Sequence, residues 1–193
     1  MINLFFAMIC CGVMAGVYGT TFPDFIGRTF KAKIIVPAFG ICVGVGEIFG
    51  SVIIGKLITR AGVKVSVCCV SILGVLMFIL TALIFPLTDI VDPVLTPHYT
   101  VALLIGLGLG MADVGFGVIL STLIGRIFKG NSQSAFSLYS GVFNLSVVAC
   151  CLMSSYGTLL VMVFVYSGLL ICAVIGIVCI ENNSFTDREK LRG

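Results

Sequence analysis

The chain has 193 residues, of which 60% are hydrophobic and 10% are charged, and its formal net charge is +3. A soluble domain carries roughly 25% charged residues, so this composition excludes an ordinary soluble globular protein. The small positive charge lies in short stretches between apolar runs, which is typical of a topology signal and not of a nucleic-acid surface. We therefore expect a membrane protein that contacts the lipid bilayer and has no DNA or RNA partner.

Six apolar runs are long enough for transmembrane helices, which need about 20 residues each. They comprise residues 4–22, 34–58, 65–85, 99–124, 134–155 and 159–180. We predict an all-α, polytopic membrane protein with one six-helix bundle over residues 1–180 and a charged cytoplasmic tail over residues 181–193. The first helix is expected to end at Pro23, and residues 24–33 to form a short polar loop.

The cysteines and the single histidine do not indicate a catalytic or metal-binding site. The nine cysteines include three adjacent pairs inside apolar runs, and neighbouring residues on a helix point about 100° apart, so they cannot share a tetrahedral ion. We interpret them as small hydrophobic packing residues. The sole histidine, His98, falls in a loop, away from any serine or cysteine nucleophile pattern. We expect no enzymatic activity, no cofactor and no metal.

Lysine and arginine residues predict the orientation, because they are enriched in cytoplasmic loops. With six crossings, the loops after the second and fourth helices share one side with both termini. That side carries Lys56, Arg60, Lys64, Arg126, Lys129, Arg188, Lys190 and Arg192, and the other carries Arg28, Lys31 and Lys33. The excess predicts that both termini are cytoplasmic in an integral, multi-pass protein.

Two carboxyl groups, Glu47 and Asp113, are the ionisable groups that the predicted spans place at membrane depth. Each precedes a basic residue by thirteen positions, Arg60 and Arg126 respectively, which places both roughly 20 Å from the cytoplasmic end. A charge near the bilayer midplane costs several kcal/mol unless it faces protein or water. One hypothesis is proton or cation coupling, or direct substrate contact. The alternative is a protonated carboxyl that bonds across a helix interface and serves packing.

Weaker polar candidates lie on the first and fifth helices. Tyr18 near the outer end of the first helix, and Tyr139 and Asn144 on the fifth, are candidate cavity-lining residues, and ordinary interhelical hydrogen bonds are an equal alternative. Glycines spaced four apart favour close helix packing in the second and fourth helices. These pairs are Gly40 and Gly44, Gly46 and Gly50, and Gly106 and Gly110.

The turn after the second helix carries a motif with a conformational role. The stretch GKLITRAGVK, residues 55–64, resembles the major facilitator signature G-x-L-x-D-R-x-G-R-K. Its glycines permit turning and its basic residues can meet helix C-terminal carbonyls. Gly55, Arg60, Gly62 and Lys64 match the signature, whereas Thr59 replaces its aspartate, which weakens any charge relay there.

A narrower resemblance covers nearly the whole chain. The segments GVYGT (16–20), GVGEIFG (44–50), GLGLGMADVGF (106–116) and LLVMVFVYSGL (159–169) are similar, in order and spacing, to the C-terminal six helices of the uncoordinated-93-like proteins of the major facilitator superfamily. The resemblance implies that Glu47 matches the G-E-I segment in the eighth helix of that fold and that Asp113 matches the G-x-x-D segment in its tenth helix. Gly117 departs from it, since asparagine often stands there.

The resemblance implies two classes of function. One is transport of a small solute, coupled to protons or cations. The alternative is a non-transporting accessory subunit that regulates another membrane protein, such as a potassium channel. One bundle lacks the second half that alternating access requires. We expect either a missing N-terminal six-helix half, which we favour, or a homodimer; a further alternative is an inactive truncated fragment.

Overall fold

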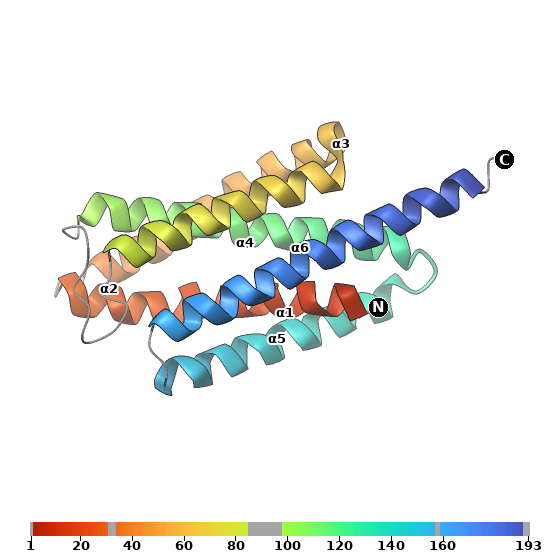
Figure 1. Ribbon diagram of the computed structural model, residues 1–193. Coiled ribbons are helices and arrows are strands. Elements are labelled where there is room, and N and C mark those ends of the chain that lie inside the picture. The colour runs from red at the N-terminus through yellow and green to blue at the C-terminus, as the bar shows by residue number, and fades with distance from the viewer. Residues whose placement is uncertain (1, 31–33, 85–97, 157–158, 191–193) are drawn as a thin grey trace.

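The computed structural model describes residues 2–30, 34–84, 98–156 and 159–190, and every regular element in these ranges is a helix (Figure 1). The elements are α1 (Ile2–Gly16), η1 (Val17–Thr21, a π-helix), α2 (Phe22–Phe30), α3 (Ile35–Ile84), α4 (Tyr99–Ile127), α5 (Ser132–Tyr156) and α6 (Leu159–Lys190). The predicted all-α class is confirmed for these residues.

Several helices are suited to crossing a membrane. Within the described residues, four stretches are long and apolar enough: Leu4–Thr21, Ile35–Ile84, Tyr99–Ile127 and Ser132–Met153. A fifth apolar stretch, Phe164–Ile180, is shorter. The membrane character expected from composition is confirmed, and the count of six crossings stays a prediction.

Helix α3 changes direction at Gly62. This residue has φ 85° and ψ 172°, which lies outside the helical region and separates two helices within the 50-residue element. Backbone of this kind is essentially restricted to glycine. Figure 1 shows α3 reversing there, so that its orange and yellow parts run in opposite directions. The turning role predicted for this glycine is consistent with its geometry.

The loop predicted for residues 24–33 is wrong for residues 24–30, which belong to α2. Pro23 does not end the first helix: α1, η1 and α2 follow one another without a break, and the widened π-helical turn directly before Pro23 accommodates a residue that has no N–H to donate. The π-helix before it provides the transition, and the Phe22 N–H donates to the Val17 carbonyl five residues back. Phe22 and Ile26 are fully buried and anchor α2 to the core. Residues 31–33 lie outside the described ranges.

The other boundaries differ by a few residues. Helix α4 continues to Ile127, three residues beyond the predicted end, and α5 begins two residues earlier than predicted. Helix α6 continues to Lys190, so most of the segment expected as a tail is helical. Phe85, the last residue of the third predicted run, and the loop that follows it to residue 97 fall outside the described residues.

Glycines allow α3 and α4 to pack backbone to backbone. A Cβ atom on Gly46 would collide with the Leu107 carbonyl oxygen, and one on Gly110 with the Val43 carbonyl oxygen. These glycine pairs therefore pack as predicted. Gly40 and Gly44, in contrast, have open space where a Cβ would lie. Helix α1 packs against both α5 and α6.

Basic residues gather at one end of the bundle. Figure 1 shows the first turn of α1, the reversal in α3, the α4–α5 turn and the last turns of α6 at the same end. The exposed side chains of Lys56, Arg60, Lys64, Arg126 and Lys129 belong to these segments. The grouping that the charge rule assumed is thus present in the fold.

Candidate functional site

Tyr18 joins the two membrane-depth carboxyl groups. Its hydroxyl lies 2.9 Å from Asp113 Oδ2 and 3.2 Å from Glu47 Oε1. The three residues come from η1, α3 and α4, and each is half-buried. Three of the sequence-predicted residues therefore form one cluster, although their sequence positions alone did not show that they face one another. We refer to Tyr18, Glu47 and Asp113 as the carboxyl cluster.

The π-helix matters for the position of Tyr18. A π-bulge adds a residue to a helical turn and commonly occurs at functional sites. Because η1 spans residues 17–21, Tyr18 lies within this widened turn and its hydroxyl reaches both α3 and α4. In the same turn, the Thr20 hydroxyl donates a hydrogen bond of 2.6 Å to the Gly16 carbonyl oxygen.

Hydrogen-bond capacity limits the protonation states of the carboxyl cluster. A tyrosine hydroxyl has one proton to donate and can accept from another donor. The Tyr18 hydroxyl can donate to only one of the two carboxyl groups at a time. The contact with the other carboxyl group is then a hydrogen bond only if that second group is protonated and donates to the Tyr18 oxygen. The geometry therefore allows the two carboxyl groups to share a proton through the Tyr18 hydroxyl.

Cys11 and Tyr139 extend the network on the other side of Asp113. The Cys11 sulfur lies 4.0 Å from Asp113 Oδ1 and 3.8 Å from the Tyr139 hydroxyl. Tyr139 was predicted as a candidate, whereas Cys11 was interpreted as packing alone. Its spacing of seven residues from Tyr18 was the available signal, because residues two turns apart share a helix face.

The remaining predicted residues lie apart from the carboxyl cluster. Asn144 is exposed, and its side-chain nitrogen donates to the Ser140 carbonyl of its own helix at 2.8 Å. Gly55, Arg60, Gly62 and Lys64 belong to the α3 reversal at the end of the bundle. Arg60 and Lys64 are exposed there.

Helix α5 presents polar side chains away from the bundle. Gln133, Ser137, Ser140 and Asn144 follow one another at intervals of three or four residues, so they share one face, and all four are exposed. The buried residues Ala135, Ser146 and Cys150 lie on roughly the opposite face. We call the four exposed residues the α5 polar stripe; of the four, Asn144 was predicted as a cavity-lining residue.

Comparison with known proteins gives one match. A family model described as "UNC-93: Ion channel regulatory protein UNC-93" matches residues 1–180, which include every helix from α1 to α5 and most of α6. No curated protein and no solved structure matches the chain.

Proposed function

Because this chain belongs to the UNC-93 family of ion channel regulatory proteins, we propose that it is a membrane-embedded regulatory subunit of an ion channel. The structural observation that carries the proposal is the α5 polar stripe. A regulatory subunit must present a surface that another membrane protein can bind, and in lipid such surfaces are recognised by small and polar residues.

Lipid is an unfavourable environment for the α5 polar stripe. A hydrocarbon chain cannot bond to amide or hydroxyl groups, so polar side chains at membrane depth normally face protein or water. The stripe points away from the chain's own core. Ser137 and Asn144 donate to carbonyl oxygens of their own helix, at 3.0 and 2.8 Å, so the hydrogen-bonding capacity that remains on the stripe is what another polypeptide, or a segment outside this bundle, would bind. Serine, asparagine and glutamine are the residues that hydrogen-bond across transmembrane helices, typically at about 0.6 kcal/mol each.

Site-specific photo-crosslinking tests this function. A photoreactive side chain is placed at Asn144 or, as the matched control, at the exposed neighbour Leu145, which points about 100° away. Crosslinks from position 144, and not from 145, to an ion channel subunit whose current is altered by co-expression of this chain support the proposal. Crosslinks to a second copy, or to another six-helix segment, would instead favour the homodimer or the missing half and contradict a channel at this surface.

A second candidate function is supported by the carboxyl cluster. Two carboxyl groups that share one tyrosine hydroxyl suit proton- or cation-coupled movement of a small solute, since intramembrane ionisable residues commonly mark ion pathways. In this proposal Asp113 and Glu47 bind the coupling ion and Tyr18 passes the proton between them.

Proton movement into proteoliposomes, followed with an internal pH-sensitive dye under an imposed potential, tests the second function. We expect Asp113→Asn to abolish any saturable, protein-dependent signal and Lys56→Gln, an exposed change at the bundle end, to leave it intact. No protein-dependent signal in the unmodified chain, with stable folding, contradicts transport by this chain and leaves the regulatory function standing.

We further propose the topology in which the chain crosses the bilayer six times, with α3 contributing two crossings on either side of Gly62 and both termini in the cytoplasm. A 50-residue helix would be about 75 Å long, more than twice the hydrocarbon thickness, which supports two crossings. The resemblance of residues 55–64 to the major facilitator signature supports an arrangement like one half of that fold.

A further inference from the structure

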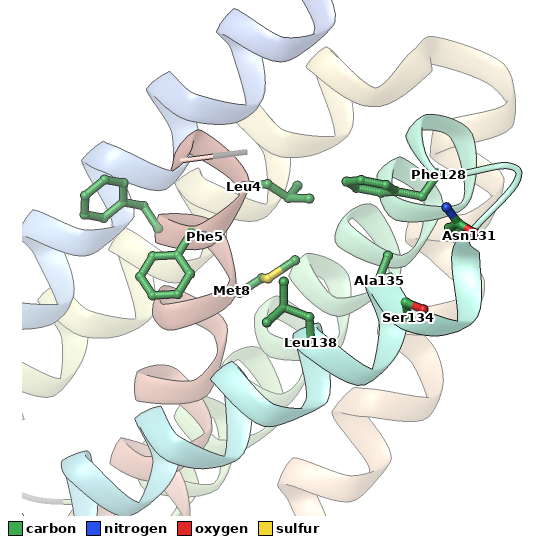
Figure 2. Close-up of a pocket in the computed structure, with 9 residues that line it drawn as sticks. Leu4, Phe5, Met8, Phe128, Asn131, Ser134, Ala135 and Leu138 are labelled. Atoms are coloured by element: carbon green, nitrogen blue, oxygen red, sulfur yellow. The ribbon is translucent and has the colours of Figure 1, made fainter.

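A pocket of about 540 Å³ opens between the start of α1, the α4–α5 turn and the start of α5. Figure 2 shows Leu4 and Met8 of α1 facing Phe128, Ala135 and Leu138 across it. Leu4 and Met8 are buried, whereas Leu138 is 55% exposed, so the pocket has a closed apolar floor and an open apolar mouth. Its volume lies within the range of ligand-binding pockets.

Polar groups lie only at one edge of this pocket. Asn131 and Ser134 are its two polar lining residues, and Figure 2 shows both at the side of the α4–α5 turn. Lys129 is between Phe128 and Asn131 in the chain, and both of those residues line the pocket. Lys129 and Arg126 are exposed. The pocket therefore has an apolar interior, and the turn that forms one of its edges carries Lys129, with Arg126 in the last turn of α4 before it.

The pocket lies apart from the carboxyl cluster and borders the α5 polar stripe at the start of α5. It lies at the basic end of the bundle, whereas the carboxyl cluster is built around Tyr18, ten residues farther along the first helix than Met8. On α5, Leu138 and Ala135 point about 100° or more away from the α5 polar stripe, whereas Ser134 lies about 60° from Ser137. Phe5 and Phe6, which also line the pocket, are 45% and 40% exposed and extend an apolar surface at its mouth.

We propose that this pocket binds one phospholipid, with an acyl chain against Leu4, Met8 and Leu138 and an anionic headgroup at Lys129 and Arg126. Charge complementarity selects this occupant: the interior has no group that would bind a polar ligand, and the chain segment that borders it carries two exposed basic residues, Lys129 in the α4–α5 turn and Arg126 in the last turn of α4. Basic side chains at the cytoplasmic edge of a membrane protein attract anionic headgroups, and their long apolar stems allow them to reach the headgroup level.

Native mass spectrometry of the full chain in detergent, titrated with phosphatidylserine or phosphatidylcholine, tests the proposal. We expect phosphatidylserine adducts to survive at lower lipid concentration than phosphatidylcholine adducts. Arg126→Gln combined with Lys129→Gln should weaken phosphatidylserine binding by at least fivefold, since each basic residue near the surface contributes a factor of about five. The same pair of changes should leave phosphatidylcholine binding unchanged.

Two tryptophan variants of exposed leucines on α5 locate the site. Leu138→Trp fills the mouth of the pocket, and Leu145→Trp, a matched change at a residue that is 71% exposed, does not. Loss of the phosphatidylserine adduct in Leu138→Trp alone supports the pocket. Equal phosphatidylserine adducts in the two variants, or equal loss in both, overturn the proposal. It is also overturned if the chain binds phosphatidylserine and phosphatidylcholine equally and the two Gln substitutions leave phosphatidylserine binding unchanged. Size-exclusion profiles of each variant show that the chain remains folded.

Discussion

At the scale of single residues, Tyr18 and Gly62 each perform a task that few side chains can replace. Tyr18 supplies the hydroxyl between Glu47 and Asp113. Gly62 adopts the backbone conformation that reverses α3. The role of Tyr18 depends on one oxygen atom, and the role of Gly62 depends on the lack of a Cβ atom. Substitutions that change only that atom therefore test each role with little change in side-chain size.

Tyr18→Phe should destabilise the chain by roughly 1.5–2 kcal/mol, because it removes the donor between two half-buried carboxyl groups; this is the lower part of the range for hydrogen bonds to charged groups. The measurement is the midpoint of thermal unfolding in detergent. Tyr166→Phe is the matched control, since that hydroxyl donates to the Met14 sulfur, a weak acceptor, and should cost less than about 1 kcal/mol. A larger loss at Tyr166 would mean that the carboxyl cluster contributes little to stability.

Gly62→Ala should destabilise the chain by about 1–3 kcal/mol through backbone strain alone, since open space surrounds the position of the added methyl group. Gly55→Ala, in the same element but in a helical conformation with open space, should be neutral or stabilising by up to about 1 kcal/mol. Urea or thermal unfolding of the two variants in the same detergent compares them. Equal stabilities would show that the reversal does not require glycine.

At the scale of helices, two devices shape the bundle: a π-helix before Pro23 and a glycine contact between α3 and α4. The first lets the opening helix continue as α2 past a proline that sequence reasoning treated as a terminator. The second brings two backbones together, which helps to hold Glu47 and Asp113 within reach of one hydroxyl. The interface between α3 and α4 is thus a structural support of the candidate site.

Gly110→Ala should weaken the α3–α4 interface by about 1–3 kcal/mol, because the added methyl group meets the Val43 carbonyl oxygen and forces the helices apart. Gly44→Ala adds the same group where nothing lies within 4 Å and should leave the folded chain intact. Fluorescence-detected size exclusion after heating ranks the variants. Equal loss of stability in the two variants would contradict a specific role of Gly110 in the α3–α4 interface.

At the scale of the whole molecule, the distribution of charge and polarity gives the bundle distinct surfaces. Exposed basic residues gather at one end, the α5 polar stripe faces outward, and the carboxyl cluster lies between η1, α3 and α4. These are the surfaces on which the proposed cytoplasmic orientation, the proposed lateral protein contact and the proposed proton-sharing site depend. Membership of the UNC-93 family gives the lateral contact its proposed partner, an ion channel.

Protease protection of sealed microsomes tests the proposed orientation. An epitope tag after Gly193 should be digested in intact vesicles, because the termini are expected on the cytoplasmic face with the basic loops. A tag inserted between residues 85 and 97, in the loop after the third predicted span, should be digested only after detergent is added. Protection of the C-terminal tag in intact vesicles would contradict the topology, and digestion of both tags would contradict the crossing between them.

The composition and the runs of apolar residues were sufficient to predict an all-α membrane protein, because the bilayer requires long apolar helices whatever their packing. The sequence also identified Glu47, Asp113 and Tyr18, since polar groups at membrane depth are rare, and its ordered motifs pointed to the family. It could not predict that one hydroxyl bridges both carboxyls or that Cys11 joins them, because these contacts join residues up to 128 positions apart. Nor could it foresee α2 or the outward direction of Asn144, which depend on a π-helical turn and on the packing of whole helices. Local chemistry thus determined which groups matter, and the tertiary structure decided which of them meet.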